Sequence, residues 1–364
     1  MKVGILGAGQ LARMIALAGY PLDVEFVFLD PSADACANPL GEHLHGDYND
    51  PRLLAELAAR ADVVTYEFEN VPADVAEFLA SHTQVHPAPK SLAVAQDRLI
   101  EKAYFRELDI PTAPYAPVYS FESLEQAISS IGFPAILKSC TMGYDGKGQS
   151  VVKSLEDLKP AWEQLAGAPG VLEGFVPFNR EVSIIAARSV SGDIVFYPLS
   201  ENVHRGGILR IATSCEGDSM QQQAEAYVSR LMEALNYVGV LALELFEVEG
   251  DLIANEFAPR VHNSGHWTIE GAETSQFENH LRAILDLPLG STAAVSKSAM
   301  VNFIGNVPAT EEILAIPNVH VHLYDKTPRK GRKVGHATVR AETKDQLDSL
   351  VKQLATLADQ VDDS

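Results

Sequence analysis

The sequence predicts a chain of mixed α/β and α+β architecture, in which a parallel sheet at the start precedes a larger, mostly antiparallel part. The chain has 364 residues, which exceeds one ordinary core and favours two or three packed units. Hydrophobic residues make up 46% and charged residues 21% of the chain, the balance of a globular protein. Short β-branched runs alternate with helical periods at the start, whereas hairpin signals appear in the middle.

The first part of the chain has the strand–helix rhythm of a parallel sheet. Apolar runs at 2–6, 24–29 and 62–68 predict strands. A helical period follows the first run to about residue 19, and another begins at 72. Because strands that alternate with helices pair in parallel, helices are expected to flank this sheet.

A proline-rich connector separates this part from the next. An amphipathic helix is expected over 97–108, and Pro111, Pro114 and Pro117 follow it. Prolines at this spacing exclude a regular helix and favour an extended segment.

From residue 120 to about 287 the pattern is mixed. Helices are expected at 121–131, 154–165 and 220–235, among strands such as 181–190 and 239–248. The turn sequences at 191–193 and 249–251 each separate two apolar or alternating runs, which indicates antiparallel hairpins. The last part adds strands near 299–303 and 319–324 and a final helix whose apolar side is Leu347, Leu350, Val351, Leu354, Leu357 and Val361.

The charge balance and the cysteines limit the partners and the compartment. Acidic residues outnumber basic ones 49 to 28, a net charge of −21, so no nucleic acid and no membrane surface is expected as a partner. Cys36, Cys140 and Cys215 are too far apart in sequence for a C-x-x-C pair, which favours a reducing cytosol. No apolar run reaches the ~18 residues of a membrane helix, and no signal-peptide core is present. A cytoplasmic protein is therefore expected.

A glycine turn follows the first predicted strand. Gly7 and Gly9 precede the first helix, and Asp30 ends the next strand, about where a dinucleotide fold places its ribose-binding acid. This pattern favours an NAD-dependent oxidoreductase. A Rossmann-like unit that binds another anion, or none, explains the same residues, because free amides at a helix start attract any anion.

A lysine and a glycine-rich loop adjoin in the middle of the chain. The apolar run 135–138 ends in Lys138, and the loop 143–149 holds Gly143, Gly146 and Gly148. Backbone amides of such a loop close over phosphate oxygens, and an ammonium group at the strand end reaches the same oxygens. The loop is not a Walker A motif, because Gly148 follows Lys147 in place of Ser or Thr. A glycine hairpin beside a surface lysine is the alternative.

Two glutamates face one another across a predicted hairpin. A turn centred on Gly250 pairs Glu244 with Glu256 among apolar neighbours. Opposed carboxylates repel unless a cation lies between them, and Mg²⁺ takes such oxygen ligands together with nucleotide phosphates. An ATP–magnesium site is therefore expected, with an exposed carboxylate pair as the alternative.

Polar and basic residues follow the second of these strands. Arg260, His262, Asn263, Ser264 and His266 lie within seven positions, a density that favours substrate contact or catalysis over packing. Five of the eight residues from Lys326 to Lys333 are basic in an otherwise acidic chain. Pro328 and Gly331 indicate an ordered turn there, which favours phosphate recognition over a solvated charged face.

These motifs together resemble ATP-grasp ligases. More narrowly, the segments 9–11, 144–149, 255–267 and 331–336 resemble the N5-carboxyaminoimidazole ribonucleotide synthetase family of purine biosynthesis. The resemblance runs from the first strand to about His336, and the stretch from Arg260 to His266 is its most specific part. One departure is Met142, where some relatives have glycine.

The resemblance implies three domains and one reaction. It implies a Rossmann-like pre-ATP-grasp domain at 1–95, an ATP-grasp domain at 96–287 and a small C-terminal α/β domain at 288–364. The reaction is the ATP- and Mg²⁺-dependent carboxylation of 5-aminoimidazole ribonucleotide with bicarbonate, which proceeds through carboxyphosphate and releases ADP and phosphate. A homodimer is also implied.

The resemblance also implies a role for each matching residue. ATP would contact Arg98, Lys138, Gly143, Tyr144, Asp145, Gly146, Lys147, Gly148, Gln149, Glu173, Gly174, Phe175, Val176, Glu181, His204, Asn255 and Glu256. Magnesium would bind Glu244 and Glu256. The ribonucleotide and bicarbonate would contact Gly9, Gln10, Leu11, Tyr144, Arg260, His262, Asn263, Ser264, Lys326 and Arg332. The residues expected to take part in catalysis are Lys138, Arg260, His262 and His266.

Three points stay open. Strand alternation would point Asn255 away from Glu256, which weakens its assignment. The proton acceptor is His262 or His266. The competing functions are the NAD enzyme, another ATP-grasp ligase such as a formate-dependent transformylase or a biotin carboxylase, and a non-catalytic nucleotide-binding protein.

Overall fold

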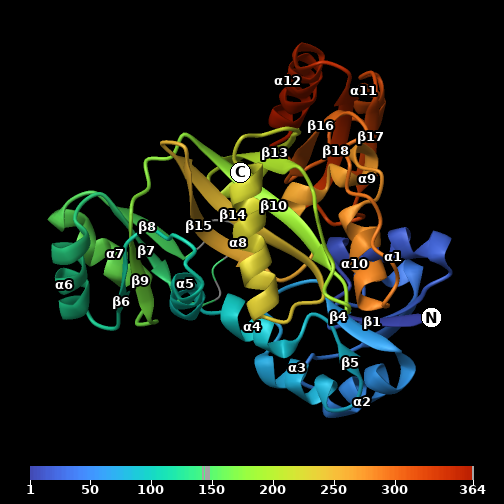
Figure 1. Ribbon diagram of the computed structural model, residues 1–364, viewed down its shortest axis with the longest axis horizontal. Helices are drawn as coiled ribbons and strands as arrows, with labels where there is room; N and C mark the ends of the chain where they lie inside the picture. The colour runs from blue at the N-terminus through green and yellow to red at the C-terminus, as the bar shows by residue number, and fades with distance from the viewer. Residues whose placement is uncertain (142, 144–147, 363–364) are drawn as a thin grey trace.

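The computed structural model describes residues 1–141, 143 and 148–362, and within them the strands form three sheets (Figure 1). No helix of these residues is long and apolar enough to cross a membrane. The N-terminal sheet lies at one end of the molecule, and a small lobe carries the four-stranded sheet to one side. The largest sheet lies between them and extends into the C-terminal part (Figure 1).

The N-terminal sheet is parallel, as predicted. Its order is β3-β2-β1-β4-β5, and every neighbouring pair is parallel. The strands are β1 (Lys2–Leu6), β2 (Glu25–Asp30), β3 (Glu42–His45), β4 (Val63–Tyr66) and β5 (Gln84–Val85), and the helices are α1 (Gln10–Gly19), α2 (Pro51–Arg60), α3 (Ala73–Ala80) and α4 (Pro89–Ala95). Strands β3 and β5 were not predicted, because β3 (EHLH) has a single aliphatic residue and β5 has only two residues.

The small lobe holds an antiparallel sheet of order β6-β9-β7-β8. Its strands are β6 (Tyr115–Val118), β7 (Ala135–Ser139), β8 (Gln149–Val152) and β9 (Gly170–Gly174), and α6 (Phe121–Ile131) and α7 (Leu158–Gln164) pack on it. The helix predicted at 154–165 begins as the 3-10 turn η3 (Leu155–Asp157). The proline connector is extended as predicted and ends in β6.

The central sheet has nine strands in the order β15-β14-β10-β12-β13-β16-β18-β17, with β11 paired to β10. The strands are β10 (Arg180–Arg188), β11 (Ile194–Phe196), β12 (Leu199–Arg205), β13 (Ile208–Cys215), β14 (Gly239–Val248), β15 (Asp251–Ala258), β16 (Lys297–Ile304), β17 (Val319–Leu323) and β18 (Lys333–Ala341). The helices after the connector are α5 (Arg98–Glu107), α8 (Gln221–Ala234), α9 (Thr268–Gly271), α10 (Gln276–Ile284), α11 (Thr310–Leu314) and α12 (Lys344–Gln360). The C-terminal strands thus continue the central sheet rather than form a sheet of their own.

Helices cover both faces of this sheet near β10. Ile184 belongs to the cluster of buried residues that contains the α8 side chains, whereas its neighbour Ile185 belongs to the cluster that contains α10 and α1. Adjacent strand residues point to opposite faces, so β10 is apolar on both. The second cluster fixes the N-terminal domain to the central sheet, because Ile15 of α1 and Leu281 of α10 both belong to it.

The β14–β15 hairpin brings the two glutamates together. Val248 pairs with Asp251 across a two-residue turn, Glu249–Gly250, in which both residues have positive φ (53° and 89°). The register then shifts between Glu244 and Leu245, which makes Asn255 the extra residue of a β-bulge. Glu244 therefore faces Glu256 as predicted, but the bulge produces this pairing, not a three-residue turn.

Candidate functional site

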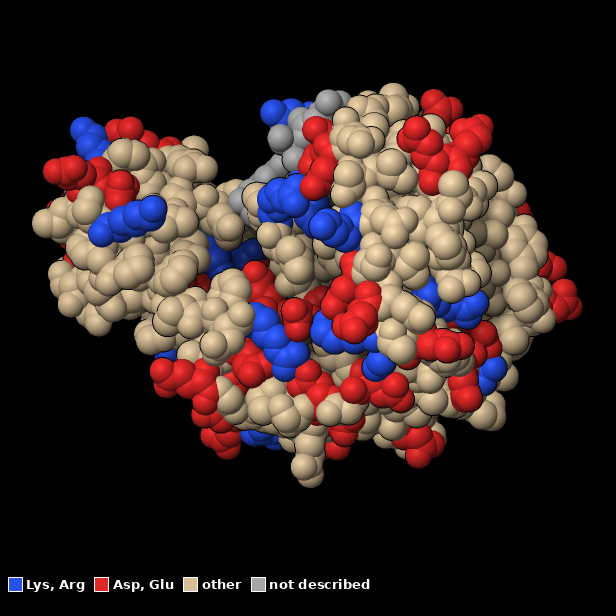
Figure 2. Space-filling model, turned by 90° about the horizontal axis from the view of Figure 1, so that it is seen from above, with Lys and Arg blue, Asp and Glu red and all other residues tan. Residues whose placement is uncertain are grey.

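The predicted site residues converge on one cavity of about 900 Å³ where the three sheets meet. Figure 2 shows the hollow between the small lobe and the rest of the molecule, with basic side chains along it. The predicted residues that line the cavity are Gln10, Leu11, Arg98, Lys138, Gly143, Gln149, Glu181, His204, Glu244, Asn255, Glu256, Arg260, His262, Asn263, His266, Lys326 and Arg332.

Several predicted residues do not line the cavity. They are Gly9, Gly148, Glu173, Gly174, Phe175, Val176 and Ser264. Phe175 lies instead in a second hollow with Phe133 and Pro134 on the small lobe. Ser264 is fully buried, so its predicted contact with substrate is corrected: it acts inside the protein. Tyr144, Asp145, Gly146 and Lys147 lie outside the described residues, as does the departure at Met142.

A buried group of charges stands at the cavity wall, where α5 meets β7, β9 and β15. Asp97 caps the helix by accepting from the amides of Leu99 and Ile100. Glu173 Oε2 then lies 3.0 Å from the ammonium group of Lys102 and 3.1 Å from that of Lys138. Lys102 was not predicted. It follows Arg98 by four residues, a helical spacing that places the two side chains on the same side of α5.

The pKa values of this group reflect burial and mutual attraction. Burial lowers the pKa of Lys138 despite the neighbouring Glu173. Burial alone would raise the pKa of Glu256, but Arg98, 2.6 Å away, and Lys138 lower it to about 2. Burial, reinforced by Glu256, raises the pKa of Glu101 to about 8. The basic side chains Arg98, Lys102 and Lys138 outnumber the acidic side chains Glu173 and Glu256 whose pKa values are lowered, which favours the binding of a polyphosphate.

The carboxylate pair already has partners in the protein. Glu256 accepts from Arg98, and Glu244 Oε1 lies 3.1 Å from His262 Nε2. The expectation that a metal must separate the two carboxylates is thus corrected: a guanidinium lies against Glu256 and an imidazole nitrogen against Glu244 in the structure. The residues still fit Mg²⁺, which needs only one or two protein carboxylates besides phosphate oxygens and water. Among the described residues, no cluster of three or more His, Cys, Asp or Glu side chains is arranged to hold a metal.

Asn255 lines the same cavity as Glu256, which corrects the expected opposite orientation. Strand alternation fails here because the bulge places two consecutive residues opposite one partner. The Asn255 Oδ1 atom is buried without a hydrogen-bond partner among the described residues. An oxygen in this state is suited to a cation or a donor group of a ligand.

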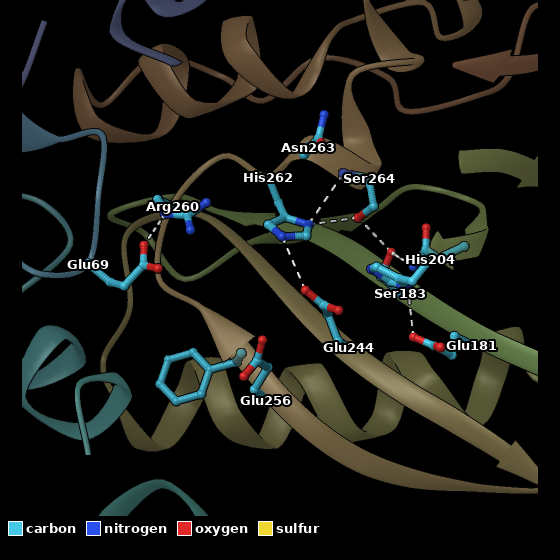
Figure 3. Close-up of polar contacts among 12 residues, drawn as sticks. Glu69, Glu181, Ser183, His204, Glu244, Glu256, Arg260, His262, Asn263 and Ser264 are labelled. Atoms are coloured by element: carbon cyan, nitrogen blue, oxygen red, sulfur yellow. Dashed lines mark hydrogen bonds and ion pairs between the residues drawn. The ribbon is translucent and has the colours of Figure 1, made fainter. Parts of the chain in front are cut away.

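Histidines stand on two sides of the carboxylate pair (Figure 3). His262 lies between Glu244 and Ser264, with its Nδ1 atom 2.8 Å from the Ser264 hydroxyl. His204 Nδ1 lies 2.8 Å from Glu181. Burial lowers the pKa of His204, but the contact with Glu181 and the negative charges of Glu181 and Glu244 together raise it above its usual value.

The other two predicted catalytic residues are also held by the protein. Arg260 forms a close ion pair with Glu69 of the N-terminal domain (Figure 3). His266 is 1% exposed, and burial lowers its pKa well below the usual range. It is therefore neutral at physiological pH.

The N-terminal glycine turn is filled by a side chain. Glu67, at the end of β4, accepts from the backbone amides of Gly9 and Ala12. A Cβ atom on Gly7 would lie 2.5 Å from the Glu67 side chain, so the glycines make room for this carboxylate. The Gly9 amide is thus not free for a substrate phosphate, which corrects that prediction.

Asp30 is likewise engaged within the protein. It accepts from the Ala8 amide and the Tyr48 hydroxyl, each at 2.9 Å, and from the Ser32 amide at 2.7 Å. The two features that favoured an NAD enzyme, free helix amides and a ribose-binding acid, are therefore satisfied inside the domain. The glycine turn is a structural feature of this fold.

The basic segment meets the first helix at the cavity. The Lys326 ammonium group contacts the Gln10 side chain, which joins two residues predicted for one phosphate site. Burial lowers the pKa of Lys326. Arg332 donates to Thr327 O at 3.1 Å, which closes the loop that begins with Lys326.

Further residues of the cavity wall were not predicted. Phe178 and Phe246 line it with stacked rings whose centroids are 4.9 Å apart. Glu67 and Glu69 line it as well. Their position directly after β4 was a usable signal, because ligands of parallel sheets bind at the carboxyl ends of the strands.

Three family models match successive parts of the chain. Residues 1–96 match the ribonucleotide synthetase preATP-grasp domain, and 103–277 match the ATP-grasp domain. Residues 298–350 match the phosphoribosylaminoimidazole carboxylase C-terminal domain. The matched order agrees with the predicted fold class.

Whole-chain comparisons give the same result. The N5-carboxyaminoimidazole ribonucleotide synthase of Pseudomonas aeruginosa is 52% identical over 357 residues, which cover 98% of this chain and 99% of the relative. The crystal structure of the synthetase from Thermus thermophilus is 51% identical, covers 98% of both chains and has a TM-score of 0.93. The Aspergillus clavatus synthase in complex with ADP and 5-aminoimidazole ribonucleotide is 32% identical, covers 99% of this chain and 98% of that one, and has a TM-score of 0.92. This chain therefore belongs to the N5-carboxyaminoimidazole ribonucleotide synthase family of ATP-grasp ligases.

Proposed function

We propose that the cavity carries out the reaction of this family with the residues in the roles given below. The reaction is the ATP-dependent carboxylation of 5-aminoimidazole ribonucleotide with bicarbonate to N5-carboxyaminoimidazole ribonucleotide, ADP and phosphate. The observation that carries the proposal is the convergence in one cavity of a cation cluster around Arg98 and Lys138, the Glu244–Glu256 pair and the basic segment at Lys326.

Arg98 and Lys138 would bind the ATP phosphates, under the loop that holds Gly143 and Gln149. Glu181 and His204, which are hydrogen bonded to one another, would meet the nucleoside part, beside the backbone of 173–176. Stacked Phe178 and Phe246 offer an apolar surface to the adenine ring.

Glu244 and Glu256, with Asn255 beside them, would hold Mg²⁺. When bound, the metal ion would neutralise charge on the transferred phosphoryl group. The chain itself positions the phosphates through Arg98 and Lys138 and keeps Glu256 ionised far below neutral pH. Enclosure of the cavity would protect carboxyphosphate from water until the amine attacks.

Lys326 and Arg332, with Gln10 and Leu11, would bind the ribonucleotide, its 5′-phosphate toward the two cations. Arg260, His262 and Asn263 line the same cavity, and bicarbonate and the amine would meet beside them. Of the two candidate proton acceptors, His266 is the better, because His262 Nε2 already faces Glu244.

The organisation proposed for the chain is three domains with boundaries near 95 and 287, in a cytoplasmic homodimer. Free thiols at Cys36, Cys140 and Cys215 accord with a reducing compartment. Sedimentation of the purified chain would test the dimer.

The direct test is product identification by mass after incubation with ATP, Mg²⁺, bicarbonate and 5-aminoimidazole ribonucleotide. We expect a product heavier than the substrate by one carboxyl group, with ADP released in equal amount. ADP release that needs neither bicarbonate nor the ribonucleotide would contradict the proposal. Reduction of a nicotinamide cofactor in place of ADP release would favour the oxidoreductase.

A further inference from the structure

A chain of buried hydrogen bonds runs from the central sheet to His262. The Asn202 side-chain amide on β12 donates to the Ser183 hydroxyl at 3.0 Å. Ser183 on β10 donates to the Ser264 hydroxyl at 2.7 Å, and that hydroxyl lies 2.8 Å from His262 Nδ1 (Figure 3). Ser183 and Ser264 are fully buried and Asn202 is 6% exposed, so water does not compete for these contacts.

Two features favour the proton on Nε2 of His262. The backbone N–H of Ser264 donates to His262 Nδ1 at 3.3 Å, and an amide can only donate, so this contact favours a lone pair on Nδ1. The Asn202 amide also donates to Ser183, and Ser183 to Ser264, which leaves the Ser264 hydroxyl to donate to Nδ1. Nε2 lies 3.1 Å from Glu244 Oε1, where an N–H group donates to the carboxylate.

All donors of the chain then point the same way. Asn202 donates to Ser183, Ser183 to Ser264, Ser264 to His262 and His262 to Glu244. Such aligned hydrogen bonds polarise one another. The sheet holds the members of the chain in place, because Ser183 faces Glu244 on β14 and Ser200 on β12. Ser200 in turn accepts from the Trp267 ring nitrogen at 2.7 Å, which anchors the loop that carries His262.

We propose that Asn202, Ser183 and Ser264 are positioning residues that hold His262 as its Nε2–H tautomer and, through it, orient Glu244 toward Glu256. The effect of these residues on Mg²⁺ binding rests on the proposed function, whereas the tautomer of His262 does not. A consequence is that His262 serves as a donor to Glu244 and not as the acceptor of the substrate amine proton. Outer partners of this kind commonly set the tautomer of a histidine and the orientation of a metal-binding carboxylate.

The first experiment reads the tautomer in the metal-free protein by nitrogen NMR with ¹⁵N-labelled histidine. The His262 signals are assigned by their loss in His262→Gln. We expect the Nε2–H form in the wild type and a mixture of both tautomers in Ser183→Ala, with Ser183→Thr restoring the wild-type form. An Nδ1–H signal in the wild type, or an unchanged signal in Ser183→Ala, would overturn the proposal.

The matched control is Ser91→Ala. Ser91, on α4, is a fully buried serine whose hydroxyl has no hydrogen-bond partner among the described residues. Ser91→Ala removes a buried serine hydroxyl, as Ser183→Ala does, but outside the chain of donors. We therefore expect a wild-type His262 signal in this variant. An equal change of the His262 signal in Ser183→Ala and Ser91→Ala would show that any loss of a buried hydroxyl perturbs His262. That result would overturn the proposal.

A second variant tests the direction of the chain. Asn202→Asp has nearly the same shape, but an ionised carboxylate at pH 8 only accepts. Ser183 would then donate to residue 202 and Ser264 to Ser183, which leaves Nδ1 of His262 to donate to Ser264. We expect a larger share of the Nδ1–H tautomer in this variant than in the wild type, because the chain then favours Nδ1–H while the Ser264 amide still favours Nε2–H. A wild-type tautomer ratio in a folded Asn202→Asp protein would overturn the one-way arrangement.

The functional readout is the Mg²⁺ concentration that gives half-maximal ADP release. Loss of one neutral hydrogen bond typically corresponds to about a three- to tenfold change. We therefore expect a requirement about three- to tenfold higher in Ser183→Ala, with KM for the ribonucleotide unchanged. An unchanged Mg²⁺ requirement would overturn the link to Glu244. Wild-type protein that releases no ADP would contradict the proposed function instead, and would leave the tautomer result standing.

Discussion

At the scale of single residues, Glu256 is the side chain on which the proposed metal site depends most. It is paired with Arg98 and faces Glu244. Glu256→Gln keeps the shape and the hydrogen bond to Arg98 but removes the negative charge. We expect the rate of ADP release to fall by about 100-fold or more, because electrostatic groups at the transferred phosphoryl contribute most of the stabilisation.

Glu247→Gln is the matched control for this prediction. Glu247 lies on the same hairpin, where it is paired with Arg180 rather than with the cavity. We expect a rate within about twofold of wild type, since partly exposed ion pairs contribute little. A normal rate in Glu256→Gln, or an equal loss in both variants, would remove Glu256 from the proposed metal site.

Glu101 makes stability depend on pH. Burial raises its pKa from 4.5 to about 8 in the folded protein, while the Phe257 amide donates to it at 2.7 Å. Between these two pH values the folded state holds a proton that the unfolded state has lost, so stability decreases as pH rises through this window. Glu101→Gln removes the titration. The free energy of unfolding of this variant relative to wild type should therefore increase from pH 5 to pH 8, by on the order of 3 kcal/mol.

Urea unfolding at pH 5 and pH 8 would measure this difference. Glu233→Gln on the exposed side of α8 is the control, for which we expect the same difference from wild type at both values. If Glu101→Gln also shows no pH-dependent difference, Glu101 is ionised in the folded protein and the charge balance of the cation cluster must be revised.

Residue-level prediction succeeded where local chemistry was decisive. The strand-end Lys138 and the facing pair Glu244 and Glu256 could be named from their neighbours alone. The ion pairs of Lys102 with Glu173 and of Glu69 with Arg260 could not, because the partners are distant in sequence. Only folding shows that such charges meet.

At the scale of elements, the β14–β15 hairpin holds the site. Its turn needs positive φ at Glu249 and Gly250, and the Cβ position of Gly250 meets open space. Gly250→Ala should therefore destabilise the protein only through its backbone, by about 1 kcal/mol, while KM for ATP stays unchanged. Urea unfolding and initial rates would measure both.

Gly250→Asn is the control for this variant. Asparagine tolerates the left-handed conformation better than alanine, so the loss of stability should be smaller. An equal loss in both variants would show that the side chain, not the backbone conformation, is responsible. A raised KM for ATP would show that the turn affects the distant pair of glutamates.

The same hairpin shows where element-level prediction stops. Turn residues predicted the hairpin, because Gly adopts positive φ without strain. The bulge at Asn255 was not predicted, since no residue type marks it, and it reverses the expected direction of that side chain. Strands β3 and β5 were missed because their pairing within the sheet, not their sequence, makes them strands.

At the scale of the molecule, the charge distribution is uneven. The net charge is −21, yet the exposed Arg329 and Lys330 stand at the cavity beside Lys326. ATP and the ribonucleotide both carry phosphate, and these basic residues would attract them to the cavity of an otherwise acidic protein. We expect the double variant Arg329→Gln/Lys330→Gln to lower kcat/KM for the ribonucleotide about three- to tenfold at low ionic strength, with kcat unchanged.

The effect should disappear at about 0.5 M salt, where exposed charges are screened. Lys352→Gln, an exposed change on α12 outside the cavity, is the control and should leave kcat/KM unchanged at every salt concentration. A loss in the double variant that persists at high salt would indicate direct binding by these residues rather than attraction at a distance.

The amino-acid sequence by itself determined the parallel and antiparallel sheets, because hydrophobic period and turn chemistry are local properties. Its motifs, through their family resemblance, also gave the order of the domains and 17 of the residues that line the cavity. Only the tertiary structure decided that Glu67 fills the glycine turn, that Lys102 meets Glu173 beside Lys138 and that the Asn202–Ser183–Ser264 chain reaches His262. These contacts join residues far apart in the chain, and their geometry depends on register and burial, which no single segment encodes.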